Sequence, residues 1–377
     1  MLIVSMVATV RASCSGNLKA SSQQDLDILK KCQVYKGSVI VENTGAQKLK
    51  IEGLQMIEGD LTVTNNDALQ SFSMPSVQGV NGILKLSNNK LLNALDLQSL
   101  TVVRSFQLAV HPALNSLNFP GGLQQTDEVS VADTTVTAIS GFKMSQMKNL
   151  VVTNNIYLKN LDLGNLTRLT GELTVSANSP ALKIDVSSLE TLNQGSFWNL
   201  AGVKLDGLKK IIGDVSFISN SFTTLALPQT TDIAGTLVVS NNKQLNNLSL
   251  PNLRHLGGAL SVGNNAQLTT VNAFPALEGI DGTLDITGAF DEVELPMLND
   301  VRGGLNVQTS SNHFSCESMD QLKNGVIKGN SFVCKAAVSQ PKSGLKGTGV
   351  DSAGTKLMAV SSGLFAMMGA LSVYVMA

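Results

Sequence analysis

The sequence predicts an all-β protein, a right-handed parallel β-helix of about 13 coils with a short N-terminal capping helix. One phrase recurs along the chain, as in GDLTVTNNDALQSFSMPSV (59–77), GILKLSNNKLLNALDLQSL (82–100) and GTLVVSNNKQLNNLSLPNL (235–253). Apolar residues alternate with polar ones inside each copy, which is typical of a strand with one buried face. A coil of this length cannot bury its apolar side alone, so stacked copies are expected.

The first apolar residue after each turn marks the repeat, and it recurs at spacings of 18 to 24 residues. The thirteen positions are Val39, Leu61, Leu84, Phe106, Val129, Leu150, Leu173, Phe197, Val215, Leu237, Leu260, Leu284 and Leu305. The rest of each repeat has the L-x-x-L-x-L-x-x-L spacing of a leucine-rich repeat. Prolines such as Pro75 and Pro228, with frequent glycine, exclude a long helix there. Short strands separated by bends are therefore expected, in a rod roughly 60 Å long.

Asparagine recurs five residues after the first apolar position. Its side chain tolerates turns and bonds to backbone groups that a bend leaves unpaired. Equal positions of stacked coils lie above one another, so a structural ladder at one corner is predicted. It comprises Asn66, Asn89, Asn155, Asn178, Asn220, Asn242 and Asn265.

The repeat from Phe197 to Val215 is irregular, because it is short, contains Trp198 and breaks the apolar pattern at Asn199. One interpretation is a deletion that bends the rod or separates two halves near 195–213. The other is a recognition feature around the tryptophan.

Both ends of the repeat region (37–315) carry a cysteine pair separated by 18 residues. Four cysteines allow three pairings, and we predict the local ones, Cys14 with Cys32 and Cys316 with Cys334, in an N-terminal cap (13–36) and a C-terminal cap (316–334). Residues 21–31 predict an amphipathic helix with a capping box at Ser22 and Asp25. Its Leu26 and Leu29 are expected to face the first coil.

The chain ends carry targeting signals. Residues 1–12 are typical of a secretory signal peptide that lacks the usual basic start, and a buried first strand is the alternative interpretation. The tail has a small-residue triplet at 352–354, a spacer and an apolar end (353–377 forming the propeptide), which indicates GPI attachment at Ser352, with Gly347 as the alternative. A membrane span is the competing interpretation, but no basic residue follows it.

Composition and motifs argue against nucleic-acid binding and against an enzyme or metal site. Net charge is −1 and charged residues make up 15%, so no nucleic-acid partner is expected. A polysaccharide-active enzyme would need converging carboxylates, and no catalytic or metal motif occurs. Asp281, Asp285 and Asp291 are close in sequence without a spacing that brings them together. The histidines (His111, His255, His313) occupy different places in the repeat, and His111 takes a ladder position. We expect no cofactor and no metal.

A line of outward residues, one per coil, is expected on a flat face. Its members are Thr62, Lys85, Gln107, Ser130, Thr174, Ser216 and Ser261. They are mostly small and polar, so the face is either simply solvated or binds a glycan or protein. Sequons at Asn165 and Asn247 predict N-glycosylation on surface loops.

The G-x-L-x-V-x-N-N coils, cysteine-flanked ends and GPI-like tail together resemble the fungal GPI-anchored cell-wall-organisation proteins, whose group includes sporulation-specific members. The resemblance covers nearly the whole chain and implies repeats related to the receptor L domain. It also implies a non-enzymatic glycoprotein at the plasma membrane or wall that supports wall integrity, with wall glycans or mannoproteins as partners. A receptor-like binding module is the alternative. The segment 335–352 is shorter than the Ser/Thr-rich stalk common in that family, which favours retention near the membrane.

Overall fold

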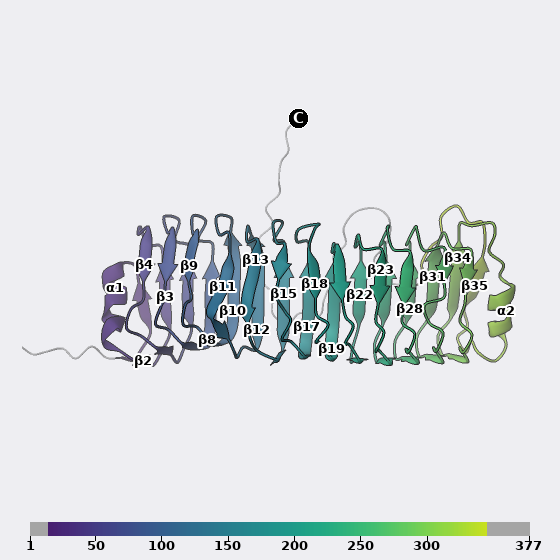
Figure 1. Ribbon diagram of the computed structural model, residues 1–377, viewed down its shortest axis with the longest axis horizontal. Coiled ribbons are helices and arrows are strands. Elements are labelled where there is room, and N and C mark those ends of the chain that lie inside the picture. Colours follow the sequence, from purple (N-terminus) through teal and green to yellow (C-terminus); the bar gives the residue numbers. More distant parts are fainter. Residues whose placement is uncertain (1–13, 345–377) are drawn as a thin grey trace, which may run out of the picture.

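The computed structural model describes residues 14–344, which form a rod of stacked coils with a helix at each end (Figure 1). The signal peptide (1–12), both candidate attachment sites, Gly347 and Ser352, and the propeptide (353–377) lie outside the described residues. Within 14–344, no helix is long and apolar enough to cross a membrane. The prediction of a parallel solenoid of about 13 coils is confirmed.

The longest wall of the rod is a parallel sheet with one strand per coil. Its strands pair in register, with Leu61 opposite Leu84 and Val63 opposite Leu86. The thirteen expected strands are joined by one more at each end, β1 and β35. In order, the strands are β1 (Leu18–Ala20), β3 (Val39–Glu42), β6 (Leu61–Thr64), β8 (Gly79–Ser87), β10 (Val102–His111), β12 (Glu128–Thr134), β15 (Asn149–Thr153), β17 (Arg168–Ser176), β19 (Thr191–Trp198), β22 (Val215–Ile218), β25 (Leu237–Ser240), β28 (Leu260–Gly263), β31 (Leu284–Gly288), β34 (Leu305–Thr309) and β35 (Phe332–Lys335).

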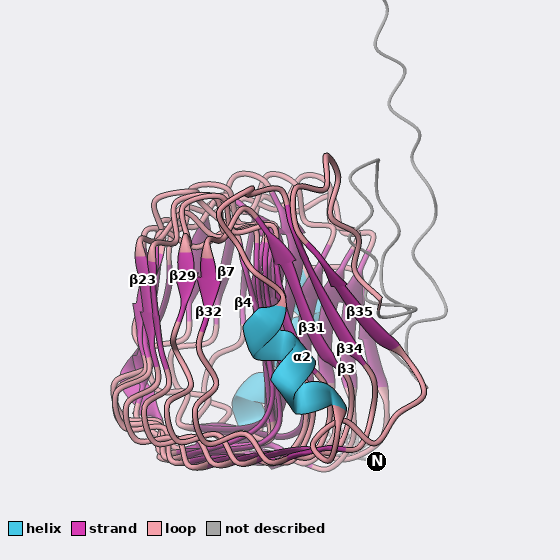
Figure 2. Ribbon diagram, turned by 90° about the vertical axis from the view of Figure 1, so that its right-hand side faces the viewer, coloured by secondary structure: helices cyan, strands magenta, loops and turns pink. Residues whose placement is uncertain are grey.

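Two further walls consist of shorter strands, and the end-on view shows the closed outline that the three walls form (Figure 2). The second wall holds β4 (Lys48–Lys50), β7 (Ser71–Ser73), β9 (Ala94–Asp96), β11 (Leu117–Leu123), β13 (Ala138–Phe142), β16 (Asn160–Leu161), β18 (Lys183–Asp185), β20 (Gly202–Lys204), β23 (Thr224–Ala226), β26 (Asn247–Ser249), β29 (Thr270–Val271) and β32 (Glu292–Val293). The third holds β2 (Val34–Tyr35), β5 (Met56–Ile57), β14 (Gln146–Met147), β21 (Lys210–Ile211), β24 (Asp232–Ile233), β27 (His255–Leu256), β30 (Gly279–Ile280) and β33 (Asp300–Val301). Strands β8, β10, β17 and β19 bend to serve both the long wall and the third wall.

The inward residues of the three walls form one continuous apolar core. Leucine, isoleucine and valine dominate it, with phenylalanine rings at intervals. The rings of Phe197 and Phe217, in neighbouring coils, lie parallel with centroids 5.0 Å apart. Each coil therefore covers the apolar side of the next, as the repeat predicts.

The register at the irregular coil differs from the sequence alignment. Leu173 pairs with Gly195, and Gly195 pairs with Val215, so Gly195 holds the first inward position that we assigned to Phe197. Phe197 is the second inward residue, opposite Val175. A Cβ on Gly195 would lie 3.0 Å from the Phe197 ring. The glycine therefore leaves room for the large neighbour, and the apolar pattern is not broken at Asn199.

The shortening of this coil lies at the corner before the second wall. Asn178 precedes its wall residue Ile184 by six positions, whereas Leu200 precedes the paired residue Val203 by three. The long wall continues through β17, β19 and β22 without interruption. The long wall and the apolar core are therefore continuous across residues 195–213.

The N-terminal cap closes the first coil. Ser22 and Asp25 form the expected capping box of α1 (Gln23–Asp27), and a 3₁₀ segment, η1 (Ile28–Lys31), continues it. Leu26 and Leu29 are fully buried. Gln23 exchanges two hydrogen bonds with the backbone of Lys50, 2.8 and 2.9 Å long, on β4. The cap thus covers the open end of the core and attaches to the next coil.

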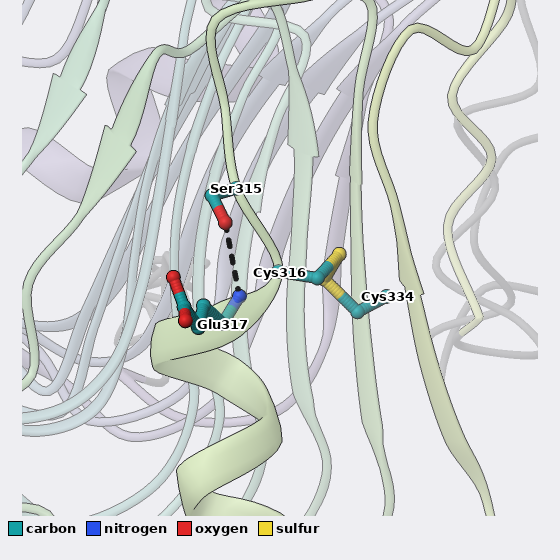
Figure 3. Close-up of a disulfide and its surroundings, with 4 residues drawn as sticks. All are labelled: Ser315, Cys316, Glu317 and Cys334. Atoms are coloured by element: carbon teal, nitrogen blue, oxygen red, sulfur yellow. Dashed lines mark hydrogen bonds between the residues drawn. A yellow bond between two sulfur atoms is a disulfide. The ribbon is translucent and has the colours of Figure 1, made fainter.

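The C-terminal cap contains α2 (Glu317–Lys323), which lies across the other end of the rod (Figure 2). Cys316 is joined to Cys334 of β35 (Figure 3), and Cys14 is joined to Cys32 in the N-terminal cap. The Ser315 hydroxyl accepts a hydrogen bond from the Glu317 N–H at the start of the helix. Both disulfides are local, and each ties a helix-containing cap to an end strand or its neighbouring loop.

Candidate functional site

The Asn-Asn pair of the repeat performs two separate tasks. The first asparagine of the pair takes a left-handed backbone conformation, as at Asn65 (φ 55°), Asn154 (φ 58°) and Asn241 (φ 58°). Asparagine tolerates this conformation better than most residues. The second asparagine points inward and is buried. From the repeat alone we assigned both tasks to the second residue and missed the first.

The buried asparagines bond to one another along the rod. In each step, the Oδ1 of one asparagine accepts from both the side chain and the backbone N–H of the previous one, at 2.9–3.1 Å. The side-chain amide also donates to the carbonyl of a strand residue, for example Asn242 to Phe217 at 2.9 Å. The amide groups of the buried asparagines are thereby paired along each run, and no asparagine of the ladder differs from the others in a way that suggests chemistry.

The ladder is divided into three runs because other residues replace asparagine at some coils. Asn66 and Asn89 form the first run, which starts at Thr44 and ends at His111. Asn155 and Asn178 form the second, which starts at Thr134. Asn220, Asn242 and Asn265 form the third, which starts at Leu200. A buried leucine thus occupies the ladder position of the shortened coil.

His111 occupies its ladder position as a fully buried side chain. Its Nε2 lies 3.3 Å from Nδ2 of Asn89, so Nε2 accepts and the ring is neutral. Burial lowers the pKa of His111 from 6.5 to about 4. The preceding Val110 is left-handed (φ 61°), which is strained for a β-branched residue.

The expected line of outward residues exists on the long wall. Register places Thr62, Lys85, Gln107 and Ser130 in successive strands. Val151 and Val238 interrupt the line further on. Ser261 is buried, unlike the earlier members, and its hydroxyl lies 3.4 Å from Asp285. The line is therefore polar but not uniform.

The acidic residues that are close in sequence separate in the structure. Asp281 contacts His255 on the third wall, and Asp291 contacts Ser311 at a corner. Asp285 lies on the outer face of the long wall and is fully buried. Among residues 14–344, no group of histidine, cysteine, aspartate and glutamate has a metal-binding arrangement.

His255 lies between two carboxylates of neighbouring coils. Its Nδ1 is 3.6 Å from Asp232 and its Nε2 is 3.3 Å from Asp281. Arg302 in turn lies 3.1 Å from Asp281. This exposed row of polar and charged groups spans four coils, an arrangement that contributes little stability because solvent screens it.

A shallow polar hollow of about 230 Å³ lies where the corner glycines give way to larger residues. Asn81, Arg104, Gln125 and Asp127 line it, together with Thr126 and two valines. The lining offers amides, one cation and one carboxylate, groups that hydrogen bond to hydroxyls. No sequence pattern indicates this site, because its residues come from three different coils.

The remaining candidate residues lie on the surface or near it. Asn165 and Asn247 are both exposed. Asn165 donates to the Phe142 carbonyl at 3.0 Å, and Asn247 lies on β26. Trp198 points outward from β19, opposite Ile218, and its indole N–H is buried without a hydrogen-bond partner among the described residues.

These features define a capped, disulfide-bonded β-solenoid with a polar surface. The amino-acid sequence shows which proteins of this class the chain is related to. The chain is 31% identical over 354 residues to a cell surface GPI-anchored protein of Arthroderma benhamiae, and the alignment covers 91% of this chain and 88% of that one. The chain belongs to the fungal family of cell-surface and cell-wall proteins that contains this relative.

Other relatives in the family carry related names. Cell wall protein ecm33 of Schizosaccharomyces pombe is 31% identical, with 86% of this chain and 77% of that one aligned. Sporulation-specific protein 2 of Saccharomyces cerevisiae is 29% identical over 83% of this chain and 63% of its own length. These names describe surface, wall and sporulation proteins, and none names an enzyme. No family model and no solved structure matches the chain.

Proposed function

We propose that this protein is a non-enzymatic, GPI-anchored cell-surface glycoprotein that supports the organisation and integrity of a fungal cell wall. Membership of a family with surface and wall proteins is the observation that carries the proposal. The structure supports the non-enzymatic part of the proposal, because the described surface has no converging set of catalytic groups. The carboxylates disperse over separate walls, and the corner asparagines, which cannot act as general acids or bases, are used for packing.

The anchor is tested by the mass of the mature protein and by enzymatic release. Phosphatidylinositol-specific phospholipase should release the protein from membranes, provided the inositol is not acylated. Replacing Ser352 with tryptophan should reduce anchoring unless Gly347 takes over. A mature protein that retains residues 364–377 would instead be a single-pass, receptor-like protein.

The wall function is tested in fungal cells that lack their own family member. The anchored protein should restore resistance to wall-perturbing dyes. A soluble version ending at residue 351 should restore less, because it is not held at the surface. Equal rescue by both versions would argue against a role that depends on anchoring.

A receptor-like module is the second candidate, and the polar hollow favours it. Purified ectodomain should then retain a wall glycan or mannoprotein in affinity capture, and Arg104→Ala with Asp127→Ala should abolish retention. Glycosylation at Asn165 and Asn247 is part of the proposal, and mass spectrometry should find glycan on both. Hydrolysis of any wall glycan, lost on mutating a single carboxylate, would overturn the non-enzymatic assignment.

A further inference from the structure

The chain does not leave the rod at β35. Residues 336–344, here called the strap, turn back along the outer face of the long wall. The N–H groups of Ala337 and Val338 donate to the carbonyls of Ser311 and Thr309, both at 2.9 Å. The short segment that leads to the predicted anchor (335–352) is thus bound to the sheet over its first half.

Further along the strap, the side chains of β34 hold its backbone. The Lys342 carbonyl accepts from Nδ2 of Asn306 at 3.0 Å and from Nε2 of Gln308 at 3.1 Å. The strap therefore crosses from β35 over β34 toward β31, against the direction in which the coils were laid down.

The strap ends on Asp285 of β31. Oδ2 of Asp285 accepts from the Ser343 hydroxyl at 2.6 Å, and Oδ1 accepts from the Gly344 N–H at 2.9 Å. Asn306 donates to the same Oδ1 at 2.6 Å. A fully buried carboxylate with three short hydrogen bonds is a strong attachment, because bonds to a charged acceptor exceed neutral ones.

We propose that the strap fixes where the membrane tether leaves the solenoid, so that the outer face near β31 is turned toward the lipid surface. This rests on the GPI anchor of the proposed function. The tether from Gly344 to Ser352 is eight residues and spans at most about 29 Å, and to Gly347 at most about 11 Å. The rod itself, with fifteen strands on its long wall, is roughly 67 Å long.

Charge near the exit agrees with a lipid partner. Lys335 and Lys342 are exposed, and neither forms an ion pair within the described part of the chain. Anionic headgroups attract such lysines at close range. The solenoid then lies with its side on the membrane, rather than standing on its C-terminal tip.

The first arm of the test measures whether Asp285 holds the strap. In the purified full-length protein, with or without a lipid anchor, Asp285→Ala should raise amide hydrogen exchange over 337–344 at least tenfold and expose the bond after Lys342 to trypsin. Asp281→Ala is the matched control, because its carboxylate lies in the same coil on another wall and should leave the strap protected. Gly344→Pro removes one donor without altering the sheet and should also loosen the strap.

The second arm measures orientation. Neutron reflectometry on supported bilayers carrying the anchored protein should give a protein layer much thinner than the rod's length, and thicker or more diffuse for Asp285→Ala. A wild-type layer as thick as the rod is long, or a strap equally protected in both strap variants, overturns the proposal. The exchange arm needs no lipid, so failure of phospholipase release would refute the anchor while leaving the strap result standing.

Discussion

Nδ2 of Asn66 donates a 3.0 Å hydrogen bond to Oδ1 of Asn89, its counterpart in the next coil. Nδ2 of Asn89 in turn donates to the Val63 carbonyl and lies 3.3 Å from Nε2 of His111 in the following coil. The same relation recurs in each run, so neighbouring coils are joined at the corner by side chains as well as by strand pairing. Removing one member leaves groups unpaired in two coils.

Asn242→Ala should therefore destabilise the protein by about 3 kcal/mol, because the Phe217 carbonyl and the Asn220 N–H lose their partners inside the core. Urea unfolding of the purified ectodomain measures the change. Asn246→Ala, at an exposed position four residues later, should leave the midpoint nearly unchanged. Equal effects of the two substitutions would show that the ladder contributes no more than a surface asparagine.

Stability should fall on acidification because of His111. Its folded pKa of about 4 lies below the unfolded value of 6.5, so the unfolded state binds more protons between these values. The stabilisation is complete above pH 6.5 and declines toward pH 4, by up to about 3 kcal/mol. His111→Asn should flatten this part of the pH profile, whereas His313→Asn, at an exposed site, should not. A mutant profile as steep as the wild-type one would contradict the assignment.

Close stacking at the corner should make Gly235 intolerant of a side chain. A Cβ there would lie 2.4 Å from the backbone carbon of Gly213 in the previous coil. Gly235→Ala should cost about 1–3 kcal/mol in unfolding free energy. Gly164→Ala is the control, since its nearest neighbour would be 3.6 Å away, and it should be neutral or slightly stabilising. Thermal melting of the wild type and the two variants measures the effect, and equal melting temperatures for both variants would contradict the prediction.

Removing the disulfide of one cap should loosen that end first. Replacing Cys316 and Cys334 with serine opens an 18-residue connection, which costs about 3 kcal/mol in the chain-entropy model. Hydrogen exchange should rise in α2 and β35 before it rises in β22. Peptide mapping without reduction should recover the two local pairs in the wild type, and a cross-link between Cys14 and Cys334 would contradict the rod.

The repeat could be predicted from sequence because alternation and period are visible in single residues. The register at Gly195 could not, because a glycine at an inward position carries no apolar signal and Phe197 supplies a misleading one. The end strands β1 and β35 were missed for a related reason: they lack the Asn-Asn pair that marks many of the other copies.

The functional features likewise divide into those that the repeat predicts and those that it does not. The ladder and the line of outward residues depend on equal positions in successive coils, which a repeat reveals directly. The strap on Asp285 and the hollow beside Arg104 join residues at unequal positions, so no periodicity points to them. Only the folded path of the chain brings Gly344 to β31.

The hydrogen bonds between coils run along the axis of the rod. A pull on its two ends therefore loads the coils in series, and the terminal coil yields before its neighbours. A released coil of about 22 residues extends by roughly 70 Å while the stack shortens by about 5 Å. Under tension, the molecule would therefore lengthen in steps, one coil at a time. When the tension falls, each released coil would refold by pairing with the strand of the next folded coil.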